Sequence, residues 1–385
     1  MYTKRFIDDD LLSRVSDWYQ LGEVIGVKTN VMAYALKNRD AMQSRIKLGD
    51  RVVYKSAPIL RFTQNRLRTL LDYLFENKIA DKDAIIAYRK GVTATEVVRN
   101  VDHAKMFVSF DIRHYYDSVT LGHIQKCLME LGLSSLGAKL VGRYCVVRKD
   151  RNKDRATLQQ GSPASPVLSN IVGHFVFDGP IEAWLKEKYP SLRCTYLRYC
   201  DNIALFVHDD PPDGFTEAFK AFTKETLKGN GFKTHKWACI ADNHPVIHQK
   251  FLGMVINNEA RAELSIVNKL RAVLFNCCLN GFNEEAHKFL ELEGVVKTRG
   301  FVADELVEDK FIRFLRGHIN YIKRINEKQG LVLSKLFKAA RVISNAGMVD
   351  GDEKSRVIDA VKQYRKPESI ERYISRINGC YGASA

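Results

Sequence analysis

The chain lacks several features that would place it in a particular class of protein. No apolar run approaches the roughly 18 residues of a membrane-spanning helix. Residues 1–15 lack the apolar core of a secretory signal, so we expect a cytoplasmic protein without a membrane partner. Eight cysteines are present, but none are spaced as C-x-x-C, which argues against a zinc ribbon or a disulfide scaffold. No internal repeat or low-complexity segment is visible.

Acidic residues are also scarce relative to basic ones. The sequence has 45 Asp and Glu against 60 Lys and Arg, a formal net charge of +15. Such an excess indicates a polyanionic partner, most often nucleic acid, although a generally basic soluble protein is the alternative. The 385 residues suit two or three domains.

The pattern of apolar residues predicts a mixed α+β protein. Residues 1–48 read as helical and are similar to a short helix-turn-helix, although a simple packing pair fits better. A strand over 51–58 ends at a proline and precedes a helix over 59–78. Strands and helices alternate irregularly through 104–260, which indicates a sheet with helices on one face. From residue 261 the pattern is almost entirely helical.

One late helix, over residues 309–326, has two distinct faces. The apolar residues Phe311, Leu315, Ile319 and Ile322 share one face at 100° per residue. The basic residues Arg313, Arg316, Lys323 and Arg324 fall on the other. This charged face is either a solvated surface or a track for nucleic-acid phosphates.

Two aspartates end or join apolar strands. Asp111 closes "MFVSFDI", and Asp201 lies in the turn of "YLRYCDNIALF". Because a lone buried carboxylate is costly, each needs a cation or several N–H donors nearby. Together they would suit Mg²⁺, which takes a few carboxylates, waters and phosphates. The alternative is two unrelated turn aspartates.

A third segment, "QQGSPASPVLSN" at 159–170, has the form of a rigid loop that enters a helix. Its prolines restrict the backbone, and Ser162 and Ser165 are candidate helix caps that would leave N–H groups free for an anion.

These segments, in this order, resemble the motifs of prokaryotic reverse transcriptases, the group that contains retron, group II intron and defence-associated enzymes. "FVSFDIRHYYDSV", "QGSPASPVLSN" and "RYCDN" resemble motifs A, B and C. "GFKTHKWACI" and "FLGMVI" resemble motifs D and E. "RVVYKSAPILRFTQNRL" and "AYRKGVTATEVVRNV" resemble finger segments, and "LRGHINYIKRIN" resembles a thumb segment. The resemblance covers roughly residues 20–345.

The resemblance implies a right-hand polymerase with fingers, an antiparallel palm sheet and a helical thumb. The expected domains are an N-terminal helical segment (1–48), fingers (49–103), palm with finger insertions (104–260), thumb (261–345) and a C-terminal helical extension (346–385).

The resemblance also implies roles for single residues. Asp111 and Asp201, with the carbonyl of Ile112, would hold two Mg²⁺ ions, and Mn²⁺ is a second candidate. Lys236 aligns with the motif D lysine, in a segment about one residue short, and a solvated lysine is the alternative. Tyr116 falls at the position that senses the sugar 2′-hydroxyl, and one of Tyr115 and Tyr116 is expected to be a core aromatic. The expected nucleotide-binding residues also include Gln160, Gly161, Arg89, Lys90 and Arg51.

A basic loop over 143–155 contains Arg148, Lys149 and Arg151. These residues, with the basic face of the helix at 309–326, are candidates for contact with the nucleic-acid backbone. A solvated charged loop is the equal alternative.

The sequence departs from the family at motif C, where two aspartates are usual and this chain has Asp201-Asn202. An amide removes a charge and a good metal ligand but keeps an acceptor oxygen. Because the first position is intact and is the one that usually contacts the metals in this fold, we expect an active enzyme.

The expected function is RNA-directed DNA synthesis from deoxynucleoside triphosphates, with an RNA template, a DNA product and, in an antiphage defence setting, a cognate noncoding RNA. A protein partner or a homo-oligomer is compatible with this function. The alternatives are a template-independent or RNA-synthesising polymerase and an inactive RNA-binding scaffold.

Overall fold

The computed structural model describes residues 9–48, 51–148, 156–244, 246–257, 259–292 and 304–345. The chain divides into two compact units, the first made of residues 1–97 and 101–247 and the second of residues 98–100 and 248–385. Within the part that the structure describes, no helix is both long enough and apolar enough to cross a membrane.

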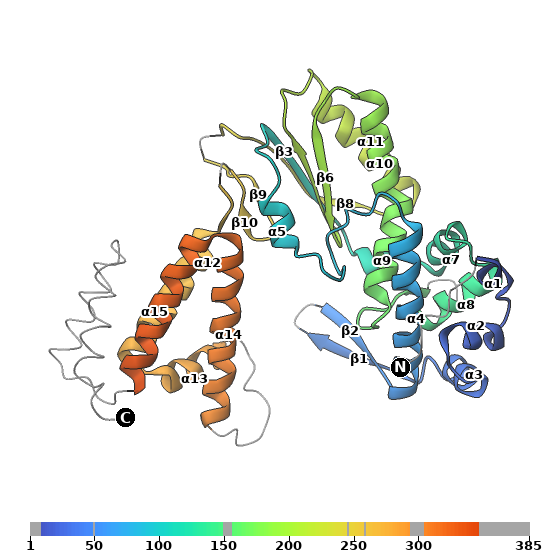
Figure 1. Cartoon of the computed structure of the whole chain (residues 1–385), viewed down its shortest axis with the longest axis horizontal. Coiled ribbons are helices and arrows are strands. Elements are labelled where there is room, and N and C mark those ends of the chain that lie inside the picture. Colours follow the sequence, from blue (N-terminus) through green and yellow to red (C-terminus); the bar gives the residue numbers. More distant parts are fainter. Residues whose placement is uncertain are drawn as a thin grey trace. The chain divides into compact units, whose positions relative to one another are not determined.

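A four-stranded antiparallel sheet forms the centre of the first unit (Figure 1). In spatial order its strands are β6 (Cys194–Tyr199), β7 (Asn202–Val207), β3 (Met106–Ile112) and β8 (Thr234–Ala241). The central strands β3 and β7 read as nearly continuous apolar runs because most of their residues are buried. The mixed α+β character and the antiparallel sheet expected from the sequence are therefore confirmed.

The described residues before position 247 also form α-helices. They are α1 (Asp9–Arg14), α2 (Trp18–Ile25), α3 (Thr29–Lys37), α4 (Pro58–Lys78), α5 (Ala94–Arg99), α6 (Tyr115–Ser118), α7 (Leu121–Glu130), α8 (Ser135–Cys145), α9 (Ser165–Gly173), α10 (Gly179–Lys188) and α11 (Phe215–Gly229). A π-helical turn, η1 (His174–Asp178), joins α9 directly to α10. The helix expected over 59–78 is confirmed as α4, whose leucines are buried.

Two further strand pairs belong to the first unit. Strand β1 (Gln43–Leu48) pairs with β2 (Arg51–Ser56), and β4 (Val146–Arg148) pairs with β5 (Ala156–Leu158). The helical prediction for residues 1–48 is thus wrong over Gln43–Leu48. Five of these six residues are exposed, so the segment has no buried stripe, and its backbone hydrogen bonds to β2 make it a strand.

The second unit is mainly a helical bundle next to a small sheet. Strands β9 (Lys250–Phe251), β10 (Met254–Val255) and β11 (Arg261–Ala262) form the sheet, and α12 (Leu264–Asn280), α13 (Phe282–Leu292), α14 (Asp304–Ile325) and α15 (Glu327–Asn345) form the bundle. The four apolar residues predicted on one face of α14 are all buried. The predicted helices over 346–385 lie outside the described residues, and the expected domain boundaries stay predictions.

The loop before α9 differs from the sequence expectation. The N-cap of α9 is Ala164, which makes no side-chain capping bond, so neither Ser162 nor Ser165 caps the helix. Ser162 Oγ accepts a hydrogen bond from the Ala164 backbone N–H at 3.3 Å instead, and Ser165 Oγ is buried without a partner.

Gly161 in this loop lies against strand β2. The Tyr54 backbone N–H donates to the Gln160 carbonyl at 2.7 Å, and a Cβ atom at Gly161 would clash with the Tyr54 carbonyl oxygen. The φ angle of Gly161 is +110°, where a side chain is strained. We expect Gly161→Ala to reduce the free energy of unfolding by about 3 kcal/mol.

Chemical denaturation of Gly161→Ala measures this cost. Gly91→Ala is the matched control, because Gly91 also has positive φ (+79°) but a Cβ atom added there would meet nothing within 4 Å. Equal destabilisation by the two variants would show that contact with Tyr54 adds nothing to the backbone strain.

Candidate active site

The fold brings Asp111 and Asp201 to the same end of the central sheet. Asp111 lies directly opposite Asn202 in the register of β3 and β7. The Ile112 backbone N–H donates to the Asp201 carbonyl at 2.9 Å. The backbones of two aspartates that are 90 positions apart in the sequence, 201 less 111, are therefore neighbours.

Asn202 contacts Asp201 through its amide. Its Nδ2 donates to Asp201 Oδ1 at 3.2 Å. An aspartate at this position could not donate and would add a like charge to the pair. The departure from the double-aspartate pattern thus replaces a repulsion with a hydrogen bond that orients the remaining carboxylate.

Lys236 reaches this site because strand β8 bulges. The register of β3 and β8 shifts between Ser109 and Asp111, so Lys236 and Trp237 together oppose Phe110. Lys236 has a φ of +51°, and its Nζ lies 3.4 Å from Asp111 Oδ2. Trp237 stacks on Phe110 at 4.8 Å between ring centroids. Bulges re-aim side chains near functional sites, and this one turns the lysine toward the carboxylate.

Of the two adjacent tyrosines, Tyr115 is the core aromatic. It is 3% exposed, and its hydroxyl donates to the Ser169 carbonyl at 2.5 Å. Tyr116 is partly exposed, and its ring packs edge-on against that of Tyr115, with 6.1 Å between ring centroids. Burial raises the pKa of the Tyr116 hydroxyl well above its usual range, so it stays neutral at physiological pH.

Gln160 and Gly161 contact strand β2 through their backbones, whereas the Gln159 side chain makes a polar network. Gln159 is fully buried. Its Oε1 accepts from Gln64 Nε2 at 2.8 Å and from Gln43 Nε2 at 2.9 Å, and its Nε2 donates to Ser56 Oγ at 2.8 Å. Sequence reasoning missed Gln159, because nothing in "QQG" distinguishes the buried glutamine from its half-buried neighbour.

The basic residues predicted to hold the triphosphate differ in their surroundings. The Arg89 side chain is only 10% exposed, and its Nη1 donates to the carbonyls of Lys82 at 2.8 Å and Ile85 at 3.2 Å. Its guanidinium is thus already engaged within its own segment. Lys90 and Arg51 are exposed. All three assignments stay predictions.

The residues predicted to contact nucleic acid are only partly described. Arg148 lies 3.5 Å from Asp40 in an exposed ion pair, while Lys149 and Arg151 lie outside the described residues. On α14 the four basic residues are exposed as expected. Two of them have partners within the second unit, since Arg313 pairs with Asp309 at 3.5 Å and Arg316 lies over the Phe337 ring at 5.7 Å.

The carboxylates of Asp111 and Asp201 suit a metal ion whose other ligands are waters and substrate phosphates. Within the described ranges, no group of three His, Cys, Asp or Glu side chains could hold an ion. Mg²⁺ is commonly bound through one or two carboxylates, with waters and substrate phosphates completing its octahedron. Asp111 and Asp201 fit that requirement, and the Lys236 ammonium beside Asp111 shows that the carboxylate accepts a cation.

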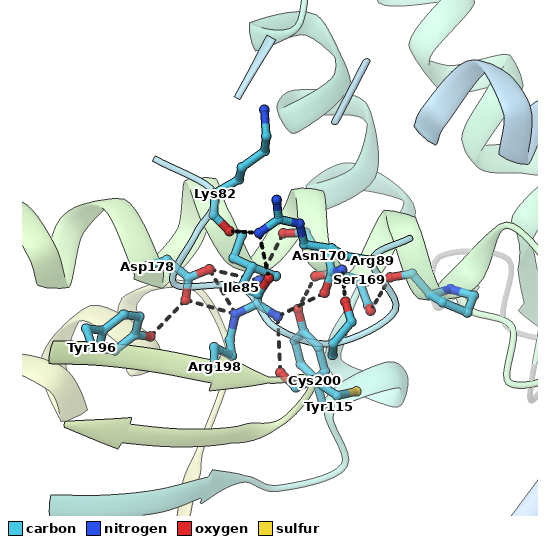
Figure 2. Close-up of polar contacts among 12 residues, drawn as sticks. Lys82, Ile85, Arg89, Tyr115, Ser169, Asn170, Asp178, Tyr196, Arg198 and Cys200 are labelled. Carbon is cyan, nitrogen blue, oxygen red and sulfur yellow. Dashed lines mark hydrogen bonds and ion pairs between the residues drawn. The ribbon is translucent and has the colours of Figure 1, made fainter. Parts of the chain in front are cut away.

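A buried ion pair lies behind the Asp201 turn (Figure 2). Arg198 on β6 and Asp178 in the π-helical turn are both fully buried, with Arg198 Nη2 2.8 Å from Asp178 Oδ2. The Tyr196 hydroxyl also donates to Asp178 Oδ1 at 2.8 Å. No pattern in the sequence indicates this pair, because its members lie 20 residues apart on a strand and on an irregular helical turn.

Glu182, one helical turn after Asp178, leads to a prediction for pH dependence. Burial and then the charge of Asp178 raise the pKa of this carboxyl from 4.5 to about 7. Since the folded state holds the proton more tightly than the unfolded state, the contribution of Glu182 to the free energy of unfolding is greatest below pH 4.5 and is lost as pH rises to about 7. We expect Glu182→Gln to remove this loss. The free energy of unfolding at pH 8 should then exceed that of wild type by about 1–2 kcal/mol, after allowance for solvent screening.

The free energy of unfolding at pH 5 and pH 8 measures this effect for both proteins. The exposed Glu187→Gln is the matched control. If the free energy of unfolding of Glu182→Gln changes between pH 5 and pH 8 as much as that of wild type, the pH dependence does not come from this carboxyl.

Paired carboxylates at the end of a buried antiparallel sheet, beside a lysine, are typical of enzymes that transfer nucleotidyl groups with metal ions. The family model for reverse transcriptase (RNA-dependent DNA polymerase) matches residues 52–256. Since the match covers more than half of the chain, the protein belongs to the reverse transcriptase family. Polymerases of this family use divalent metal ions. The match contains Asp111, Asp201 and Lys236.

Comparison with solved structures finds telomerases. Telomerase from Candida albicans, in complex with a fragment of telomeric RNA, has a TM-score of 0.42 and 14% identity over 89% of this chain and 70% of that one. The corresponding Candida tropicalis complex has a TM-score of 0.42 and 12% identity over 84% of this chain and 64% of that one. Apo telomerase from Candida tropicalis, truncated from its C-terminal domain, has a TM-score of 0.38 and 10% identity over 52% of this chain and 45% of that one. The chain thus spans about half of the last protein. No curated protein matches significantly, and the family assignment rests on the family model.

Proposed function

We propose that this protein is an RNA-directed DNA polymerase that extends a primer 3′ hydroxyl with deoxynucleoside triphosphates. The observation that supports this most is the meeting of Asp111 and Asp201 at one end of the β3–β7 pair, within the matched region of the family. In the proposed right-hand layout, residues 49–103 are fingers, 104–260 the palm and 261–345 the thumb.

In the proposed reaction, the primer 3′ hydroxyl gives its proton to solvent water as its oxygen attacks the α-phosphorus of the incoming nucleotide. The bond from that phosphorus to the β-phosphate oxygen breaks, and pyrophosphate leaves with its electron pair. Asp111, Asp201 and the Ile112 carbonyl would hold two Mg²⁺ ions, which stabilise charge on the attacking and leaving oxygens when bound. Lys236, next to Asp111, is suited to give a proton to the departing pyrophosphate.

Other residues would position the substrates. The Tyr116 ring packs edge-on against Tyr115 and would meet a 2′-hydroxyl on a ribonucleotide sugar. Gln160 and Gly161 would border the nucleotide and the template base. Lys90, Arg51 and Arg89 would approach the triphosphate, with Arg89 first leaving its present carbonyl partners. Helix α14 would follow the duplex with its exposed basic residues.

The proposed partners are an RNA template, the DNA product and the four deoxynucleotides. We place the protein in a prokaryotic cytoplasm, in an antiphage system with a cognate noncoding RNA. This setting follows from the motif resemblance of residues 107–256 to defence-associated enzymes.

Incorporation of labelled nucleotides tests the proposal. Each deoxynucleotide and each ribonucleotide is offered separately with a primed RNA template, in Mg²⁺ and in Mn²⁺. We expect template-directed incorporation of deoxynucleotides that is lost in Asp201→Ala. Incorporation of ribonucleotides alone would favour an RNA-synthesising enzyme. RNA binding without any incorporation would instead favour a non-catalytic scaffold.

A further inference from the structure

Every N–H donor of the buried Arg198 guanidinium has an acceptor (Figure 2). Its Nε donates to Asp178 Oδ1 at 2.9 Å and Oδ2 at 2.8 Å. Nη1 donates to the Cys200 carbonyl at 3.2 Å and Asn170 Oδ1 at 3.4 Å. Nη2 donates to the Asn170 carbonyl at 3.1 Å and pairs with Asp178. A guanidinium has five such donors in a rigid fork, so its position is fully fixed.

The chain around Arg198 is shaped to admit this group. A Cβ atom at Gly173 would lie 2.6 Å from Arg198 Cζ, so only glycine leaves room for the guanidinium there. The π-helical turn at His174–Asp178 ends at the carboxylate that pairs with it. Such turns occur often at functional sites. Since replacing a buried ion pair with apolar residues is often neutral or stabilising, its contribution to stability does not explain why the chain contains it.

One of the acceptors belongs to the turn that presents Asp201. Cys200 has a φ of +58°, a conformation that a side chain rarely adopts and that persists only where the surroundings hold it. Its carbonyl, which receives the Arg198 bond, belongs to the peptide group that continues into Asp201. Holding this carbonyl sets the plane of that peptide and therefore the direction in which the Asp201 side chain leaves the turn.

The backbone of Arg198 connects the same turn to a distant segment. The Arg198 N–H donates to the Ala84 carbonyl at 2.7 Å, and the Ile86 N–H donates to the Arg198 carbonyl at 3.0 Å. Asn170 Nδ2 donates to the Ala87 carbonyl at 2.7 Å. Arg198 thus joins the Asp201 turn, helix α9 and the segment 84–87 in one hydrogen-bonded network.

We propose that Arg198, held by Asp178 and Asn170, is a positioning residue that fixes the Cys200–Asp201 peptide so that Asp201 faces Asp111 in metal-binding geometry. This inference rests on the proposed function for its catalytic consequence. Its structural content is independent, because the relative position of the two carboxylates can be measured by metal binding without any polymerisation.

The test uses the full chain and Mn²⁺ alone as the metal probe. Arg198→Lys keeps the charge opposite Asp178, but a single ammonium cannot replace the fork that reaches both Asp178 and the Cys200 carbonyl. Substitution of residues that orient metal ligands typically costs about 10- to 100-fold in metal affinity or activity. We expect Mn²⁺ affinity and kcat each to fall within that range, with KM for the deoxynucleotide within about twofold of wild type. Arg193→Lys, in an exposed pair with Asp209, is the matched control.

A double variant separates positioning from folding. Asp178→Leu with Arg198→Met replaces the buried charges by apolar side chains, so we expect a melting temperature near that of wild type. We expect the loss of Mn²⁺ affinity to remain, because no donor then reaches the Cys200 carbonyl. Recovery of both the melting temperature and the Mn²⁺ affinity would overturn the proposal. Failure of both variants to fold would also overturn it, because the pair would then serve the fold itself.

The same measurements distinguish failure of the proposed polymerase function from failure of the positioning role. A wild-type protein that binds Mn²⁺ through Asp111 and Asp201 but incorporates no nucleotide contradicts the proposed function and leaves the positioning role intact. A wild-type protein that polymerises, with an Arg198→Lys variant equal to it in Mn²⁺ affinity and kcat, contradicts the positioning role alone.

Discussion

We expect Asp201→Asn to lower nucleotide incorporation by about a thousandfold or more, and Asn202→Asp to leave it within about threefold of wild type or to raise it. The difference follows from the geometry. Asp201 lies in the turn beside Asp111, and its carbonyl holds the Ile112 N–H. An amide at position 201 removes one of the two charges available to a metal.

Asn202 has a different relation to the site. Its amide donates to Asp201 Oδ1 and carries no charge. An aspartate there loses this hydrogen bond but adds a third carboxylate, which attracts cations more strongly. Rates of single-nucleotide incorporation at several Mg²⁺ concentrations distinguish the two variants, with the exposed Asp213→Asn as a control. Similar rates for the two variants would show that the ranking of positions 201 and 202 is wrong.

We expect Tyr116→Ala to raise incorporation of ribonucleotides relative to deoxynucleotides by about 10- to 100-fold. The Tyr116 ring is held in place by edge-on packing against Tyr115, with 6.1 Å between ring centroids. A fixed ring excludes a 2′-hydroxyl by its volume, and alanine removes that volume.

The matched control for this prediction is Tyr116→Phe. It keeps the ring and removes only the hydroxyl, so exclusion by volume predicts nearly wild-type selectivity. The ratio of kcat/KM for paired nucleotides, such as dATP and ATP, measures the effect. If Tyr116→Phe accepts ribonucleotides as readily as Tyr116→Ala does, the hydroxyl and not the ring volume discriminates between the two sugars. If the kcat/KM ratio is unchanged in both variants, Tyr116 has no part in sugar recognition.

Elements with a buried stripe could be predicted from the sequence. The leucines of α4 and the apolar face of α14 recur at helical spacing and are buried. The strand that carries Asp111 and the strand that follows the Asp201 turn appear as apolar runs for the same reason. Strand β1 could not be found in this way, because five of its six residues are exposed and only its pairing with β2 defines it.

Side-chain partners from separate elements could not be predicted. The contact of Arg198 with Asp178 depends on a π-helical turn that no apolar period reveals. Gln159 is distinguished from Gln160 by hydrogen bonds to three side chains that lie far from it in the sequence. The approach of Lys236 to Asp111 depends on a bulge in β8, and the spacing of a regular strand does not allow for the residue that a bulge adds.

The sequence of the product made by the wild-type protein tests the polymerase assignment most directly. A primed RNA of defined sequence is incubated with the four deoxynucleotides and Mg²⁺, and the extended strand is sequenced. A DNA strand complementary to the supplied RNA is the expected product. A product unrelated to the template, or no product from protein that still binds the RNA, would contradict RNA-directed DNA synthesis.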